Sequence, residues 1–333
     1  MALPEPKIAK PEPMISGPLN SDSRHQFPRV SVIIPVYNGA ATIERALKSV
    51  FEQTFDDFEI VVVDDGSTDE TPSVLAKFGD RIRMFRQPNR GLPGARNAGV
   101  AVSRGELIAL IDHDDEWLPQ KLELTVAAFA DNPTVALVYS DMIVVNEAGE
   151  ESRRSPIKPD TAHAPTMDEM LTRIWPITPS TVVMRRAAFD RAGGFCETLI
   201  SAEDIHFWLL MREQGDFVYI PDKLVRFTFG QLYPKVLNRD IGPDAIVDLI
   251  RTRYGSRADR LIADFIRHRV RMIANAGVIE MSRGNLAGAR RCFIRVLRYD
   301  PRHVKSYLRL VRSYLPATIA RALSGRAARG ARF

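Results

Sequence analysis

Three clusters of acidic residues stand out as groups that could act together. They are Asp64 and Asp65 in VVVDDGSTDET, Asp112, Asp114 and Asp115 in LIALIDHDDEW, and Glu203 and Asp204 in SAEDIHFW. Three carboxylates within four residues repel one another unless a cation offsets their charge. Hard oxygen ligands suit Mg²⁺ or Mn²⁺, which commonly bridge a few carboxylates to substrate phosphates. The second cluster therefore predicts a divalent metal site, and its alternative is a solvated turn with helix-capping Asp residues.

The other two clusters predict binding and proton transfer. Asp64 and Asp65 follow an apolar run, so they could accept hydrogen bonds from a nucleobase or sugar while the stretch 67–70 caps a helix. Tyr37 also follows an apolar run, and its ring could stack on a base. A carboxylate at the start of the helix near Asp204 could take a proton from an acceptor hydroxyl. The alternative for this last cluster is capping by Ser201 or Asp204.

Short β-branched runs alternate with amphipathic stretches and must position these clusters. Near-continuous apolar strands between helices indicate an α/β fold with a mostly parallel sheet covered on both faces. Ligands of such sheets bind beyond the carboxyl ends of the strands, where the acidic residues stand. We predict strands at 30–36, 58–63, 81–85, 106–111 and 135–145 and over TVVM, and helices at 42–53, 70–78, 94–103, 119–130, near Met167 and from Ala202.

The C-terminal third differs in character from the rest. GNLAGARRCFIRVLRYDP has the spacing of a tetratricopeptide helix pair, which this segment resembles. An α-helical appendage therefore follows the α/β fold. We expect a disordered Pro-rich segment at 1–28, an α/β domain at 29–232, a linker or mixed region at 233–260, a helical segment at 261–315 and a basic amphipathic tail at 316–333.

Composition excludes several classes of protein. The 333 residues include 46 Lys and Arg against 41 Asp and Glu, a net charge of +5. Residues 251–333 carry 20 basic and 4 acidic side chains, so they contribute +16 and the remainder −11. With only Cys196 and Cys292, a disulfide scaffold and a zinc ribbon are excluded. No apolar run reaches the roughly 18 residues of a membrane span. We expect a cytoplasmic protein, with a peripheral place at the cytoplasmic face of the inner membrane as an alternative.

Taken together, the motifs resemble those of family 2 glycosyltransferases, which have the GT-A fold. The resemblance covers about residues 29–230 and rests on VSVIIPVYNG, VVVDDGSTDET, NRGLPGARNAG, LIALIDHDDEWLPQKL and GGFCETLISAEDIHFW. It implies transfer of a sugar from a nucleotide diphosphate donor to an acceptor hydroxyl, with inversion and with Mg²⁺ or Mn²⁺. It also implies a saccharide or lipid-linked acceptor, and a place in bacterial surface polysaccharide or glycolipid synthesis.

The same resemblance assigns roles to individual residues. Asp204 corresponds to the catalytic base and Glu203 to its partner. Asp114 and Asp112 correspond to the metal-binding DxD pair, and Asp115 supports them. Cys196 stands where the family often has Asp. The implied nucleotide-sugar contacts are Pro35, Tyr37, Asn38, Asp64, Asp65, Arg96, Asn97 and Asp112, with Arg90 a weaker candidate.

Two other functions stay open at this point. A nucleotidyltransferase of similar fold would release pyrophosphate from a nucleoside triphosphate. A noncatalytic adaptor would act through the basic C-terminal helices, which could dock on a membrane surface or a protein. The glycine-rich turn of a dehydrogenase and the Gly-Lys-Ser/Thr of a P-loop are both absent from the sequence, and no nucleic-acid-binding module is recognised.

Overall fold

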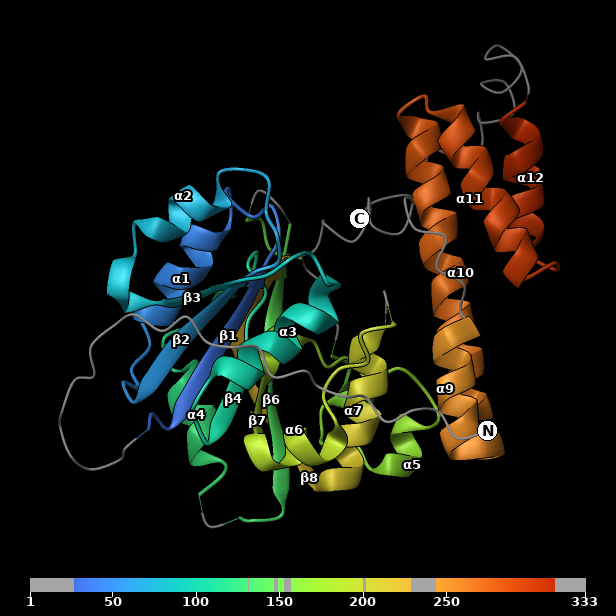
Figure 1. The fold of residues 1–333 in the computed structure, drawn as a ribbon. Coiled ribbons are helices and arrows are strands. Elements are labelled where there is room, and N and C mark those ends of the chain that lie inside the picture. The colour runs from blue at the N-terminus through green and yellow to red at the C-terminus, as the bar shows by residue number, and fades with distance from the viewer. Residues whose placement is uncertain are drawn as a thin grey trace.

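The protein was analysed as a computed structural model, which describes residues 27–130, 132–146, 149–152, 157–199, 202–228 and 244–314. Most of the segment predicted to be disordered, the first part of the segment 233–260 and the basic tail 316–333 lie outside the described residues. Within them the chain forms a mixed sheet with helices on both faces and a helical C-terminal region (Figure 1).

The sheet has the order β3-β2-β1-β4-β7-β6-β8-β5 among the described residues. Strands β1 to β4, β6 and β8 run parallel, whereas β7 and β5 are antiparallel to their neighbours, which confirms a mostly parallel sheet. The strands are β1 (Val30–Val36), β2 (Phe58–Asp64), β3 (Arg83–Arg86), β4 (Leu107–Leu110), β5 (Glu116–Trp117), β6 (Val135–Val145), β7 (Val182–Arg185) and β8 (Asp216–Thr228).

Helices cover both faces of this sheet because the central strands are apolar on both sides. In β1, Val32 and Ile34 pack on one face with Leu47 of α1, whereas Ile33 points to the other face and packs with Ala95 of α3. The helices of the sheet region are α1 (Ile43–Phe51), α2 (Thr71–Ala76), α3 (Gly91–Val102), α4 (Lys121–Ala127), α5 (Met167–Met170), α6 (Arg186–Ala192) and α7 (Glu203–Gln214).

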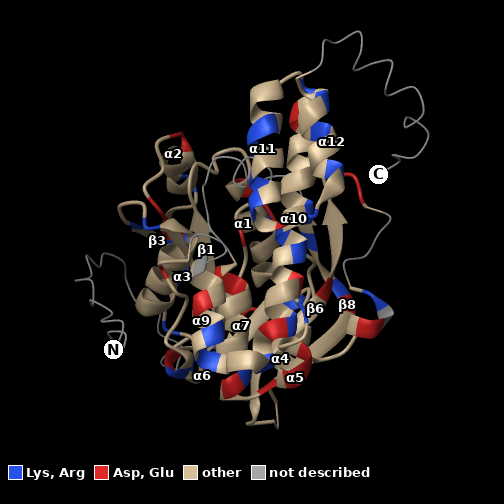
Figure 2. Cartoon of the chain, turned by 90° about the vertical axis from the view of Figure 1, so that its right-hand side faces the viewer, with Lys and Arg blue, Asp and Glu red and all other residues tan. Residues whose placement is uncertain are grey.

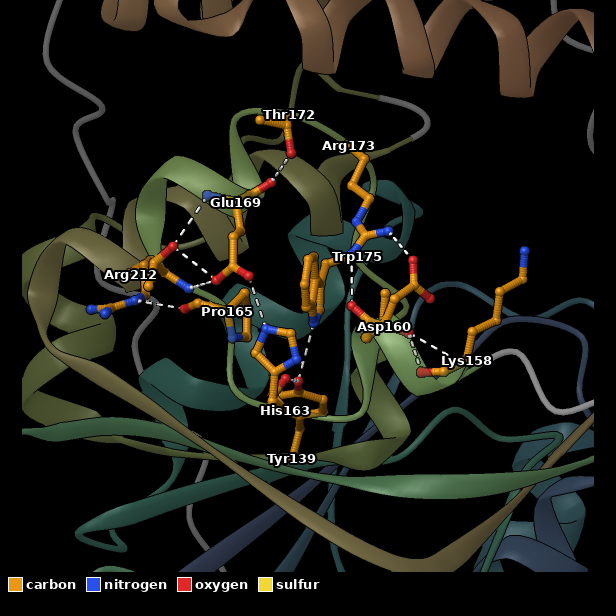
Figure 3. Close-up of polar contacts among 12 residues, drawn as sticks. Tyr139, Lys158, Asp160, His163, Pro165, Glu169, Thr172, Arg173, Trp175 and Arg212 are labelled. Carbon is orange, nitrogen blue, oxygen red and sulfur yellow. Dashed lines mark hydrogen bonds and ion pairs between the residues drawn. The ribbon is translucent and has the colours of Figure 1, made fainter.

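A polar network holds residues 160–175, which lie between β6 and β7, against β6 (Figure 3). The Tyr139 hydroxyl donates to the carbonyl of His163 at 2.7 Å and accepts from Trp175 Nε1 at 3.2 Å. His163 Nε2 lies 2.9 Å from Glu169, and Arg173 pairs with Asp160 at 2.6 Å. These bonds tie the chain to β6 just before the 3₁₀ turn Pro179–Thr181, which enters the candidate site.

Four helices are described in the C-terminal region, and the first three contribute to two hydrophobic cores. They are α9 (Asp244–Tyr254), α10 (Asp259–Ser282), α11 (Leu286–Tyr299) and α12 (Val304–Arg312). Ile250 of α9 and Phe265 in the first half of α10 join the core that contains α3 and α7. Ile273 in the second half of α10 instead packs with Cys292 and Val296 of α11 in a separate cluster. Helix α10 therefore connects the sheet region to a helical pair.

The C-terminal region is helical in the segment predicted as a linker and in the predicted helix pair. The described part of the segment 233–260 is helical and packs on the main core through Ile246 and Ile250. The expected helix pair is present as α10 and α11, and a Cβ at Gly277 would lie 2.6 Å from Phe293, so glycine permits their close approach. None of the helices in the described part of the chain has both the length and the apolar character needed to cross a bilayer.

Candidate active site

One acidic cluster lies at the end of β2, a second follows β4, and a third is in the first turn of α7. Residues at the start of helix α3 contact all three. Because β1, β2 and β4 are parallel neighbours, the residues after them meet at one edge of the sheet. Arg90, the N-cap residue of α3, donates its backbone N–H to Asp65 in the cluster after β2. Arg96 in the second turn of α3 contacts the other two clusters. All three clusters therefore contact α3 or its N-cap residue.

In the cluster after β2, the two carboxylates have different surroundings. Asp64 is fully buried, accepts a hydrogen bond from the backbone N–H of Ser67 at 2.9 Å and lies 3.4 Å from Arg86 Nε. Its side chain shapes the turn. Asp65 Oδ1 accepts from Gln87 Nε2 at 2.7 Å and from the backbone N–H of Arg90 at 2.9 Å. Asp65 is thus held at the start of α3.

The loop after β1 lies against this turn. Asn38 has a left-handed φ of 52°, and its Oδ1 accepts from the backbone N–H of Thr68 at 2.8 Å. Asn38 N donates in turn to Ser67 Oγ at 2.9 Å, so this residue ties two loops together. Pro35 is buried within β1, whereas Tyr37 is 47% exposed. Among these predicted nucleotide contacts, Tyr37 has the ring most available for stacking.

The decisive contact of the site is made by the guanidinium of Arg96. Its Nη2 lies 2.8 Å from Asp112 Oδ1 after β4, and its Nη1 lies 3.1 Å from Glu203 Oε1 at the start of α7. The Arg96 side chain is only 1% exposed. Burial disfavours its charge, but the carboxylates of Asp112 and Glu203 outweigh this effect and raise the pKa of Arg96. Arg96 thus joins the loop after β4 to the start of α7.

Asp204 lies beside this ion-pair network. Burial, together with the neighbouring Glu203 carboxylate, raises the pKa of Asp204 to about 7. Its Oδ1 accepts from the backbone N–H of Ile205 at 2.8 Å. The preceding Ala202 has a left-handed φ of 61°, a strained conformation of the kind found at functional sites. Helix α7 begins without a side-chain cap in the described residues, so Asp204 does not serve as the N-cap.

In the cluster after β4, Asp114 and Asp115 follow Asp112 in the sequence, and these two residues contact parts of the fold other than Arg96. The Asp114 carbonyl accepts from Arg45 Nη2 at 2.9 Å and from Thr228 Oγ1 at 2.5 Å, which fixes its backbone. Asp115 is buried and accepts from Ser180 Oγ at 2.5 Å and from Thr228 N at 2.8 Å. Burial, with Asp112 and Asp114 nearby, raises the pKa of Asp115 well above its usual value. Asp115 is therefore a support for this loop.

Asn97 binds the turn formed by residues 193–195. Its Nδ2 donates to the carbonyl of Phe195 at 2.8 Å, and its Oδ1 accepts from the N–H of Phe195 at 2.9 Å. Gly194 has φ of 75°, and a Cβ there would lie 2.8 Å from Asn97 Oδ1. Arg90 Nη2 pairs with Glu197 at 2.7 Å. In this structure the side chains of Asn97 and Arg90 bind the turn that leads to α7, where we had expected nucleotide contacts.

The two histidines beside the acidic clusters contact other parts of the fold. His113 Nδ1 lies 2.8 Å from Thr42 Oγ1 and so joins the loop after β4 to the start of α1. His206 is buried near Arg253 of α9, and burial with that positive charge lowers its pKa to about 4. Both histidines therefore have surroundings that fit structural roles.

Residues 112–115 form the DHDD loop, and the sequence did not predict which side chains hydrogen-bond to it. Ser180 Oγ accepts from Asp112 N at 3.0 Å and donates to Asp115, while Thr228 contacts both Asp114 and Asp115. Ser180 and Thr228 lie 65 and 113 residues from Asp115 in the chain. No local signal in the sequence marks such distant partners.

Comparison with known proteins identifies the domain. Residues 31–193 match the family model described as Glycosyl transferase family 2. This part of the chain belongs to glycosyltransferase family 2. The matched range contains the clusters after β2 and β4 and all of α3, whereas Glu203 and Asp204 lie beyond it. The family resemblance of the sequence is confirmed.

Curated relatives match about three fifths of this chain. An uncharacterized protein of Mycobacterium tuberculosis is 32% identical over 212 residues, which are 59% of this chain and 66% of that protein. The chondroitin synthase of Pasteurella multocida is 31% identical over 209 residues, 61% of this chain and 21% of the synthase. The chain thus covers less than two thirds of the length of these relatives.

Solved structures confirm the GT-A-like fold. S. aureus TarS 1–349 in complex with UDP has a TM-score of 0.52 at 22% identity, with 86% of this chain and 89% of that chain covered. The mannosyltransferase PcManGT from Pyrobaculum calidifontis, in complex with GDP-Man and Mn²⁺, has a TM-score of 0.54 at 20% identity, with 90% and 87% covered. At these identities the likeness concerns the fold.

Proposed function

We propose that this family 2 chain transfers a sugar from a nucleotide diphosphate sugar to an acceptor hydroxyl at the edge of the sheet around α3. The bridge of Arg96 between Asp112 and Glu203 carries the proposal. It brings the loop suited to a metal and a diphosphate beside the helix that bears Asp204. A donor and an acceptor could then react between the two.

The donor side takes the nucleotide in this proposal. Tyr37 would stack on the base, and Asp65, held by Gln87 and the start of α3, would accept hydrogen bonds from the base or ribose. The related folds support a nucleotide sugar, since TarS is in complex with UDP and PcManGT with GDP-Man. Asp64, Asn38 and Asn97 would act by shaping the loops around the nucleotide.

The residues of the DHDD loop fit a divalent ion that the donor helps to bind. No group of three or more His, Cys, Asp or Glu side chains in the described residues could hold a metal alone. Asp112 and Asp114 offer hard carboxylate oxygens, and Mg²⁺ or Mn²⁺ usually binds one or two carboxylates together with substrate phosphates. When bound, the ion would neutralise negative charge on the departing diphosphate.

Asp204 is the proposed general base. It would take the proton of the acceptor hydroxyl while the hydroxyl oxygen bonds to the anomeric carbon and the bond to the diphosphate oxygen breaks. A single displacement of this kind inverts the configuration at that carbon. Glu203, held by Arg96, would keep Asp204 in place. We also propose a saccharide or lipid-linked acceptor, as in surface polysaccharide or glycolipid synthesis.

A donor screen tests the proposed function. The full chain is incubated with UDP- and GDP-sugars and Mn²⁺, and thermal stabilisation and release of nucleoside diphosphate are measured. We expect one donor to stabilise the chain and to yield nucleoside diphosphate. NMR of the product should show an inverted configuration at the anomeric carbon. Pyrophosphate release from a nucleoside triphosphate would instead establish a nucleotidyltransferase.

Replacing Asp114 by Ala should weaken metal-dependent donor binding by about 10-fold or more, because a carboxylate ligand of the ion is lost. Calorimetric titration with nucleoside diphosphate, with and without Mn²⁺, measures the effect. The exposed Asp80, in the turn 79–81, provides the control Asp80→Ala. Equal titrations for Asp114→Ala and the unchanged protein would remove Asp114 from the site.

The pKa of Asp204 predicts a pH dependence. A general base must be ionised, and burial with Glu203 raises the pKa of this carboxyl to about 7. We expect kcat/KM to rise with pH and to reach a plateau above about 8, and to fall about 10-fold per pH unit well below 7. Initial rates between pH 5 and 9 measure the profile. A profile that is flat from pH 5 upward would contradict this environment for the base.

A further inference from the structure

In the described part of the chain, the C-terminal helices carry most of the exposed large apolar side chains. Eight of the eleven large apolar side chains that are exposed in the described residues lie between residues 278 and 314. They are Val278, Leu286, Ile294, Val304, Tyr307, Leu308, Val311 and Tyr314. Five of these eight are in or next to α12. Such a concentration on one short helix marks an interaction surface.

Helix α12 is oriented with its apolar side outward. Ser306 in this helix and Ser313 at its C-cap, seven residues apart, are buried, at 0% and 1% exposure. Arg290 of α11 bonds to Ser313, which fixes this orientation. Val304, Leu308 and Val311 have the i, i+4, i+7 spacing of one helical face and are 61–66% exposed. We call this apolar stripe the α12 face.

Positive charge surrounds the α12 face. Residues 286–314 contain eight Lys and Arg against a single Asp. Lys and Arg recur along α11 and α12 in the view of Figure 2. Within α12, Lys305, Arg309 and Arg312 are interspersed with the apolar stripe, and the helix has no acidic residue. Exposed apolar side chains beside Lys and Arg are the pattern of helices that lie in a membrane interface.

We propose that the α12 face binds an anionic lipid surface. The charge selects this occupant among the alternatives. A second copy of the chain would bring one basic α12 against another. The stretch 315–333 adds four Arg and no acidic residue, so it too has the same sign of charge. An anionic bilayer offers both a partner for the Lys and Arg side chains and an apolar layer for Val304, Leu308 and Val311.

Vesicle flotation of the full chain tests this proposal. We use phosphatidylcholine vesicles with and without roughly a third of phosphatidylglycerol. The test variant is Leu308→Asp combined with Val311→Asp, and the matched control is Met84→Asp, which alters an apolar side chain 50% exposed on β3. We expect binding to the anionic vesicles only, a loss of about tenfold or more in the double variant, and unchanged binding in the control.

Each other outcome overturns the proposal. Equal flotation of the double variant and the control would show that the α12 face is not the contact. Absence of binding to anionic vesicles would exclude a lipid surface. Concentration-dependent self-association without vesicles, abolished in the double variant, would assign the face to a second copy, and binding to nucleic acid in place of vesicles would assign it to that polymer. Because all sites changed are highly exposed, circular dichroism should show unchanged folding.

Discussion

Asp204→Asn should lower kcat by about 10²–10⁴-fold while donor binding changes little, because an amide cannot accept the proton of the acceptor hydroxyl. Glu203 and Arg96 keep their ion pair in this variant, so the site stays assembled. Initial rates at saturating donor and acceptor, together with a nucleotide titration, separate the two effects. The exposed Asp190 of α6 supplies the control Asp190→Asn, for which unchanged rates are expected.

Stability offers a check that the loss in Asp204→Asn is chemical. A folded-state pKa of about 7 means that folding favours the protonated carboxyl. Its stabilising contribution is complete below the unfolded pKa of about 4 and is lost as the pH rises through 7. At pH 8 the neutral Asn avoids the cost of the buried charge, so the variant should unfold at an equal or higher temperature. Retained turnover in this stable variant would remove Asp204 from its role.

Arg96→Met should lower the free energy of unfolding by about 3–5 kcal/mol at pH 7.5, because Asp112 and Glu203 would then face each other beside a buried apolar side chain. Urea denaturation measures the change. Arg257→Met breaks an ion pair with Asp168 whose side chains are 65% and 85% exposed, and it should cost less than about 1 kcal/mol. The contrast isolates the effect of burial.

The pH dependence of Arg96→Met gives a second test. Without the guanidinium, the two negative charges repel each other, and acid relieves this repulsion. The deficit in stability should therefore shrink as the pH falls toward 4. Arg96→Lys keeps one charge but cannot span both carboxylates, so an intermediate loss is expected. A loss below 1 kcal/mol in Arg96→Met would show that the bridge contributes little to folding.

Much of the sheet was predictable because its central strands are unbroken apolar runs. The strand predicted at 135–145 is β6 itself, and that at 30–36 is β1. Strand β8 was not predicted, since Pro221, Asp222 and Lys223 interrupt its pattern and favour a loop. Pairing with β6, through register shifts near Ser140 and Asp141, accommodates that interruption. Tertiary pairing here prevails over local preference.

The site was predictable in place and less so in detail. Strand ends located the carboxylates, because parallel strands deliver their following residues to one edge. The partner of each side chain depends on contacts across long stretches of sequence, such as Arg96 with Glu203, 107 residues apart. For the same reason Arg96 and Asn97 were expected at the nucleotide, whereas their polar atoms contact Glu203 and Phe195.

Helix α10 separates the proposed active site from the α12 face by a constant distance. Its 24 residues extend about 36 Å without a break. One end is embedded beside α7, which begins at Glu203, and the other carries α11 and thereby α12. A chain settled on a bilayer through α12 would hold its reacting edge at a constant height above the lipid headgroups. Only acceptors whose hydroxyl reaches that height could then react, so the length of α10 would contribute to acceptor selection.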